Sequence, residues 1–128
     1  MIRKVDNNTI KKWFVNCEAI MSKYSIDSSL PMIIEWALYK NYIQLKACIC
    51  EYTENIKMIE ESYGTLQPDG TKKIDTTSNT VMEMYKNEVD ILNGKSVELE
   101  IEMVNHNLLK GFNGVSLETM ALLSFMIS

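Results

Sequence analysis

The sequence predicts a mainly α-helical protein built on a long antiparallel helical hairpin that looks like a coiled coil. Two observations support this fold class. Most of the 128 residues follow the 3.6-residue period of amphipathic helices. Only one stretch, near the C-terminal end, alternates apolar and polar residues with the period of a strand. A chain of this length can fold around one hydrophobic core, so we expect residues 1–128 to form a single domain.

The composition is that of an ordinary globular protein, with 46% hydrophobic and 23% charged residues. No run approaches the roughly 18 apolar residues that cross a bilayer. The chain also turns polar too early for the apolar stretch of a signal peptide. The three cysteines are too few and too irregular for a disulfide framework. We therefore expect a cytoplasmic protein that does not contact a membrane.

The first predicted helix covers residues 9–24. Its apolar residues recur at the spacings of one helical face, and Asn8 or Thr9 can cap its start with a side-chain oxygen. Pro31 suits the first turn of a second helix, because that position does not need the N–H that proline lacks. The apolar face of the first helix consists of Ile10, Trp13, Phe14, Cys17, Ile20, Met21 and Tyr24.

The second predicted helix is about 33 residues long and ends at Gly64, where we expect a left-handed cap. Its apolar residues alternate at spacings of four and three, which is the pattern of a coiled-coil seam. Its first part, residues 32–38, is apolar on more than one side, so several elements are expected to pack there. The seam consists of Leu38, Tyr42, Leu45, Ile49, Tyr52, Ile56, Ile59 and Tyr63.

A turn over residues 67–70 reverses the chain, because Pro68 fixes φ at one corner and Gly70 accepts a positive φ at the other. Ser78 or Thr77 can then cap a third helix, whose apolar face stops at Asn93-Gly94. The second and third helices are expected to pack antiparallel, with the Pro-Asp-Gly turn at the tip of the hairpin.

Residues 96–103 alternate strictly between polar and apolar residues, which predicts one half-buried strand over 97–104. A strand on its own leaves backbone donors and acceptors unpaired. The candidates to pair with it are residues 1–5 and a weaker extended piece over residues 72–75. Its polar face is acidic and carries Glu98, Glu100 and Glu102.

The last predicted element is an apolar helix over residues 116–127. Gly111 and Gly114 indicate a turn before it, and Ser116 can cap its start. Because this helix is apolar on nearly every side, we expect it to be buried in this chain or against another.

A family resemblance runs from about residue 28 to the C-terminal end. The order of signals resembles short, uncharacterised proteins encoded by bacteriophages and prophages. The resemblance implies a phage or an integrated element in a bacterial cell as the context, and it brings no catalytic residue, cofactor or activity. It is carried by Leu30-Pro31, Tyr39-Lys40-Asn41, Glu61-Ser62-Tyr63-Gly64, Asp69-Gly70, Val97-Glu98-Leu99-Glu100-Ile101 and a Leu-rich last helix.

The sequence shows no catalytic or cofactor-binding motif. The only histidine, His106, has no nucleophile or acid motif beside it and is interpreted as a polar residue after the strand. Cys48 and Cys50 lie in the second helix, where residues two apart point away from each other and cannot share a metal ion. The five glycines form no phosphate-binding loop. We therefore expect no enzyme, no cofactor and no metal site.

The charge pattern indicates a protein partner. The net charge is −4, although the first 23 residues hold five Lys or Arg against two acids. Direct nucleic-acid binding is disfavoured, because it depends on neutralising phosphates. We interpret the acidic surface as a docking site for a basic, nucleic-acid-handling host protein, as in an anti-CRISPR or another inhibitor of host defence. The candidate interaction residues are Glu98, Glu100, Glu102, Glu88 and Asp90.

Two alternatives remain open at this point. A phage structural or assembly protein would form homo-oligomers through strand 97–104 or helix 116–127. A small enzyme would use the glutamate cluster with His106. The nine methionines are interpreted as core filling, with an adaptable binding surface as the other explanation.

Overall fold

The computed structural model describes residues 2–23, 30–109 and 117–128. It confirms a mainly helical fold, to which two small antiparallel sheets are added. Within the described ranges, no helix is both long enough and apolar enough to cross a membrane. The elements are β1 (Ile2–Asp6), α1 (Asn7–Lys23), α2 (Met32–Tyr63), β2 (Gly64–Leu66), β3 (Lys72–Ile74), α3 (Asn79–Gly94), β4 (Ser96–Glu100) and α4 (Leu117–Leu122), with 3₁₀ turns at His106–Leu109 and Ser124–Met126.

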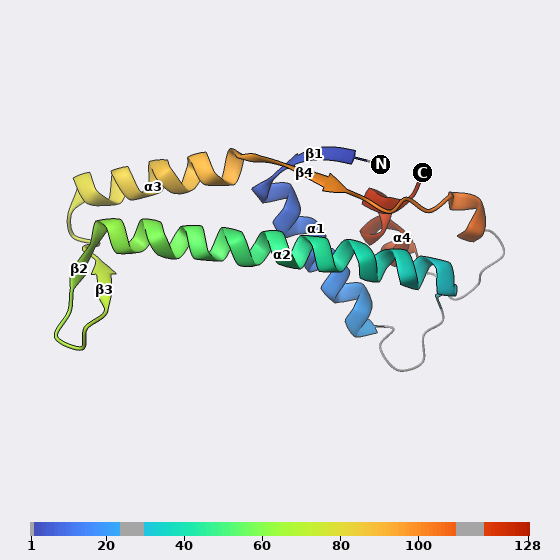
Figure 1. Cartoon of the computed structure of the whole chain (residues 1–128), viewed down its shortest axis with the longest axis horizontal. Helices are drawn as coiled ribbons and strands as arrows, with labels where there is room; N and C mark the ends of the chain where they lie inside the picture. The colour runs from blue at the N-terminus through green and yellow to red at the C-terminus, as the bar shows by residue number, and fades with distance from the viewer. Residues whose placement is uncertain (1, 24–29, 110–116) are drawn as a thin grey trace.

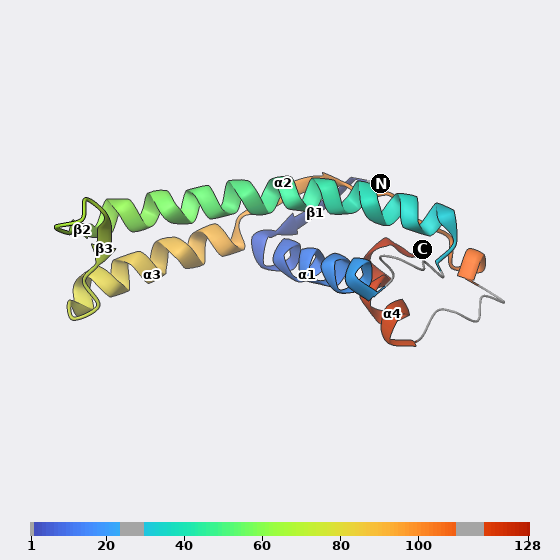
Figure 2. The same ribbon diagram turned by 90° about the horizontal axis from the view of Figure 1, so that it is seen from below.

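Helix α2 runs along the whole molecule, and the other elements lie beside it (Figure 1). Helix α3 lies beside its second half, whereas α1, the β1–β4 sheet and the C-terminal segment surround its first half. Figure 2 shows α1 and α3 following one another along the same side of α2. We call residues 51–94 the arm and the remaining described residues the body.

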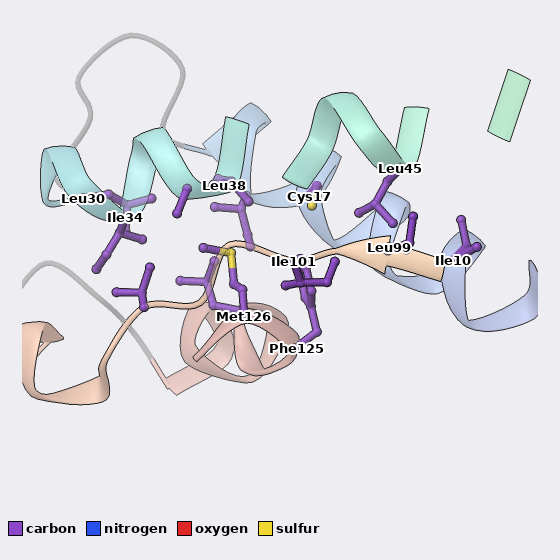
Figure 3. Close-up of a cluster of buried hydrophobic side chains, with 14 residues drawn as sticks. Ile10, Cys17, Leu30, Ile34, Leu38, Leu45, Leu99, Ile101, Phe125 and Met126 are labelled. Atoms are coloured by element: carbon purple, nitrogen blue, oxygen red, sulfur yellow. The ribbon is translucent and has the colours of Figure 1, made fainter. Parts of the chain in front are cut away.

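A single hydrophobic core lies in the body and joins α1, the first half of α2, β4 and the C-terminal segment (Figure 3). Helix α1 buries the face that its period predicted. The arm has no comparable core, because α3 contains no buried residue and its apolar face is only half-buried against α2. The core includes Ile10, Cys17, Ile20, Ile34, Leu38, Leu45, Leu99, Ile101, Val104, Leu123, Phe125 and Met126.

Strand β4 pairs antiparallel with β1, the N-terminal segment that the sequence offered as one of two partners. Leu99 lies opposite Arg3, and Val97 lies opposite Val5. The expectation of a strand over 97–104 is too long, because β4 ends at Glu100. The other candidate, β3, pairs instead with β2, a strand that the sequence did not predict.

The edge of β4 that faces away from β1 has no neighbouring strand among the described residues. Two side-chain amides of α2 bond to the backbone there, and just beyond the end of β4, as a third strand would. Asn41 accepts a hydrogen bond from the Glu102 N–H at 2.8 Å and donates one to the Glu102 carbonyl at 3.0 Å. Gln44 accepts from the Glu100 N–H at 3.1 Å and donates to the Glu100 carbonyl. Alternate residues of an extended chain direct their backbone groups to the same edge. This edge is therefore occupied within the chain at Glu100 and Glu102.

Helix α1 begins at Asn7, directly after β1, so its cap differs from the expected Asn8 or Thr9. The Asp6 carboxylate accepts a hydrogen bond from the Thr9 N–H at 2.7 Å. Hydrogen bonds from the Thr9 side chain and from the Thr9 N–H lower the pKa of Asp6, because they favour the ionised form. Helix α3 is capped by Ser78, one of the two predicted residues, which accepts from the Val81 N–H.

The expected left-handed cap at Gly64 is wrong, since this residue has φ −78° and ψ 150° and continues into β2. A glycine is needed at this position because neighbouring atoms leave no room for a side chain. A Cβ atom would lie 2.8 Å from the Glu60 carbonyl oxygen and 2.9 Å from the Lys72 Cβ. The turn at 67–70 is confirmed, with Gly70 at φ 85°, and it joins β2 to β3.

The expectation of one buried helix over 116–127 is also wrong. Helix α4 ends at Leu122, and Leu117 is 86% exposed. The last residues extend to pair with Val104, whose N–H donates to the Met126 carbonyl at 2.7 Å and whose carbonyl accepts from the Ser128 N–H at 2.9 Å. Inside a helix the backbone N–H and carbonyl groups bond to each other, so the residues that bond to Val104 cannot be part of a continuing helix. Residues 24, 111, 114 and 116, on which other predictions fall, lie outside the described residues.

Candidate interaction surfaces

The acidic face predicted for the strand has basic and apolar neighbours in the structure. Glu98 lies opposite Lys4 in the β1–β4 register, and Glu100 lies opposite Ile2. Directly opposite residues of an antiparallel pair lie within side-chain contact, and opposite charges attract across the strands. Strand β1 therefore offsets part of the negative charge that the sequence placed here.

Glu102 lies beyond the end of β4 and is paired with a base. Its carboxylate is 3.3 Å from Lys40 Nζ, and both side chains are partly exposed. Lys40 Nζ also lies 4.4 Å from the ring centre of Trp36, within cation–π range. The three strand-region glutamates consequently form a mixed surface and not a uniformly acidic one.

The other two candidate residues, Glu88 and Asp90, lie on α3 in the arm. Partial burial and the Glu88 carboxylate, which hydrogen-bonds Tyr63, raise the pKa of the Tyr63 hydroxyl. Asp90 is exposed. Figure 1 shows α3 and β4 in line, so the structure separates these two residues from the three glutamates of the body.

The arm concentrates negative charge more strongly than the strand does. Residues 51–94 hold nine acids against four lysines, a net charge of −5, whereas residues 1–50 hold seven bases against four acids, a net charge of +3. Sequence reasoning found Glu88 and Asp90 but assigned the main surface to the strand. The nine acids of the arm are Glu51, Glu54, Glu60, Glu61, Asp69, Asp75, Glu83, Glu88 and Asp90.

A polar cluster connects the arm to the body where α1, α2 and α3 meet. Lys11 Nζ lies 3.2 Å from the Tyr52 hydroxyl and 3.2 Å from Asn93 Oδ1. The Tyr52 hydroxyl donates to the same Asn93 oxygen, and Lys11 Nζ lies 4.7 Å from the centre of the Tyr52 ring. Because each polar group has a partner in the cluster, we interpret it as a structural joint. Sequence reasoning missed this cluster, since the three residues lie far apart in the chain.

Cys17 is buried, Cys48 is half-buried, and His106 contacts the backbone. Burial raises the pKa of the Cys17 thiol to about 12 and also raises that of Cys48, so neither is a ready nucleophile at neutral pH. Cys50 is exposed. His106 Nδ1 lies 2.9 Å from the Ser128 carbonyl oxygen. In the part of the chain that the structure describes, no three His, Cys, Asp or Glu side chains gather to hold a metal ion.

The described surface contains several hollows. A cavity of about 480 Å³ lies between the end of α1 and the start of α2, with Met21, Trp36 and Tyr39 among its apolar walls. One of about 400 Å³ lies between α2 and the end of α3, and one of about 210 Å³ lies between α2 and the start of β4. These two share Asn55, Leu92 and Lys95 and so adjoin each other.

An exposed apolar stripe on the first half of α2 is a further candidate surface. Met32, Trp36, Tyr39 and Ile43 follow helical spacing and are 84, 54, 56 and 50% exposed. The sequence contained the signal, because this part of the helix was recognised as apolar on more than one side. Several elements were expected to pack against this part of the helix, and they do so on the opposite face, against Ile34, Leu38 and Leu45. Contiguous exposed apolar residues of this kind are typical of interaction sites.

No family model, curated protein or solved structure matches this chain. Its function is therefore inferred from its own residues. The strongest features are the net charge of the arm, the groove between α2 and α3, and the apolar stripe on α2.

Proposed function

We propose that this protein is a non-enzymatic binding protein whose acidic arm docks on a basic protein of its host cell. The observation that carries the proposal is the segregation of charge, with −5 on residues 51–94 and +3 on residues 1–50. The arm extends away from the body (Figures 1 and 2), so its field reaches an approaching partner. Acidic surfaces steer basic partners and speed their association.

The context implied by the sequence resemblance indicates the class of partner. In a phage or prophage setting, we propose that the partner is a nucleic-acid-handling protein in the cytoplasm of the bacterial host. A defence nuclease is the best candidate, inhibited or modulated as by an anti-CRISPR. The arm's carboxylates would occupy the positions of nucleic-acid phosphates. In this proposal α2 and α3 act as a coiled-coil-like hairpin, which holds the carboxylates in a fixed arrangement.

Charge reversal on the arm tests the proposal. Replacing Glu83 and Asp90 by lysine leaves seven acids and six bases in residues 51–94, so the net charge changes from −5 to −1. Both side chains are exposed, so the fold is expected to persist. Capture of the basic partner from host lysate should fall at least tenfold, as judged by affinity purification and mass spectrometry.

The control for this experiment is Glu98→Lys, which reverses a charge on the body. It should retain the partner, and raised salt should release the partner from the unsubstituted protein. Recovery of no basic protein, or capture that is indifferent to both salt and the arm substitutions, contradicts the proposal.

Self-association is a second candidate function, as for a phage structural or assembly protein. The sequence offered strand 97–104 or helix 116–127 as the interface, but β4 is paired with β1 and bordered by Asn41 and Gln44, and the helix ends at Leu122. The exposed stripe on α2 now favours self-association instead. Sedimentation velocity at tens of micromolar should then show a dimer that Trp36→Gln and Ile43→Gln weaken at least tenfold. Val15→Gln, at a 60% exposed position on α1, should leave the dimer intact. A strict monomer excludes this candidate.

A further inference from the structure

In the groove between α2 and α3, the apolar side chains of Met58, Ile59 and Leu92 lie among polar ones, and no described element covers them. We call this groove the arm groove. The hollow is about 400 Å³, and a smaller one of about 210 Å³ continues it toward the body. Met58, at its outer edge, is 64% exposed. The lining consists of Asn55, Met58, Ile59, Ser62, Leu92 and Lys95.

The rim of the arm groove is acidic. Glu54 and Glu61 flank Met58 at i−4 and i+3 on α2, and Glu88 lies one turn before Leu92 on α3. Glu51 lines the adjoining smaller hollow. Lys57 and Lys95 oppose these four carboxylates, so the rim keeps a net charge of −2 within an arm of −5.

The charge decides among the possible occupants of this groove. Two copies of an arm of net charge −5 repel each other, which opposes a four-helix bundle formed by a second copy. The same sign opposes nucleic acid and anionic membranes. A cationic partner is attracted, and a groove between two helices that carries apolar side chains is the shape that accepts the apolar face of a third helix. Methionine side chains adapt to such partners with little strain.

We infer that the arm groove binds a cationic amphipathic helix of the partner protein. The inference rests on the proposed function and names the partner's recognised element. The α2 residues that line this hollow and the smaller one beside it run from Cys48 to Ser62, about 21 Å at 1.5 Å per residue, which accommodates a helix of three to four turns. The bound helix presents apolar side chains at i and i+4 toward Met58 and Leu92, and its Lys or Arg residues face the glutamates of the rim.

Designed peptides test this inference directly. The first peptide is a helix with leucines at i, i+4, i+7 and i+11 and with lysines on both flanks. The second has the same composition in scrambled order, so that its charge is equal but its apolar stripe is lost. Fluorescence anisotropy at low salt should show at least tenfold tighter binding of the first peptide. A third peptide, with glutamate in place of lysine, should not bind.

Substitutions at Met58 locate the site. Met58→Gln removes the apolar contact without changing the charge and should weaken binding of the first peptide at least tenfold, whereas Met58→Leu should preserve it. Met32→Gln, at an 84% exposed position at the other end of α2, is the matched control and should have no effect. Circular dichroism of each variant checks that the helices are retained.

The outcomes separate this inference from the proposed function. Equal binding of the ordered and scrambled cationic peptides, or normal binding by Met58→Gln, contradicts helix binding in the arm groove. Either result leaves recognition of the partner by charge intact. Loss of host-protein capture by the arm charge reversal, together with normal capture by Met58→Gln, has the same meaning. Groove-dependent peptide binding without any basic host partner overturns the proposed function and supports the groove.

Discussion

Replacing Asn41 by leucine should lower the free energy of unfolding by about 2–6 kcal/mol, because two backbone groups lose their partner. Asn41 is fully buried, and its amide both donates to and accepts from Glu102. Leucine has nearly the same shape but no polar atoms. The Glu102 N–H and carbonyl would be left unpaired against the apolar core, and each unsatisfied group costs about 1–3 kcal/mol.

Urea denaturation followed by circular dichroism measures this loss. The matched control is Gln44→Leu, which removes the equivalent pair of bonds to Glu100. Those bonds lie at the surface, where water can replace the amide, so the cost should stay below about 1 kcal/mol. If the two variants are equally stable, the difference in burial between the two amides has no energetic consequence and the prediction is wrong.

Phe125→Ala should destabilise the protein by about 3–5 kcal/mol, the usual cost of removing a buried phenylalanine. The Phe125 ring is 5% exposed and stacks on Trp13 at 5.0 Å between ring centres. Its carbonyl also accepts a hydrogen bond from Arg3 at 2.9 Å. The substitution therefore opens a cavity where the C-terminal segment closes the core against α1 and β1.

The control for Phe125 is Leu117→Ala, which truncates an 86% exposed leucine in the same segment. This change should alter stability by no more than about 0.5 kcal/mol. Denaturant unfolding measures both variants, and near-UV circular dichroism reports the surroundings of Trp13. If the sequence-based expectation of a buried helix over 116–127 were correct, both substitutions would be costly.

Local sequence patterns were enough to predict most of the helices. The apolar face of α1, the Ser78 cap and the turn at Gly70 all follow from residues within a few positions of each other, whereas Met84 and Ile91 of the face predicted for α3 are exposed. Their causes are short-range, since helical period, capping and positive φ depend on neighbouring residues. The candidate surface was predicted less well. The acids were visible in the sequence, but not the bases that the fold brings beside them.

The sequence by itself determined the first three helices, the turn at Gly70 and the acidity of residues 51–94, whereas the tertiary structure decided how the backbone groups of the strands are paired. Alternation predicted a strand that contains β4, but β1 and the amides of Asn41 and Gln44 supply its partners. The last helix was overpredicted for the same reason, because Val104 pairs with a segment more than twenty residues later. Helices satisfy their backbone groups locally, whereas extended chain must find partners elsewhere, and only the folded arrangement supplies them.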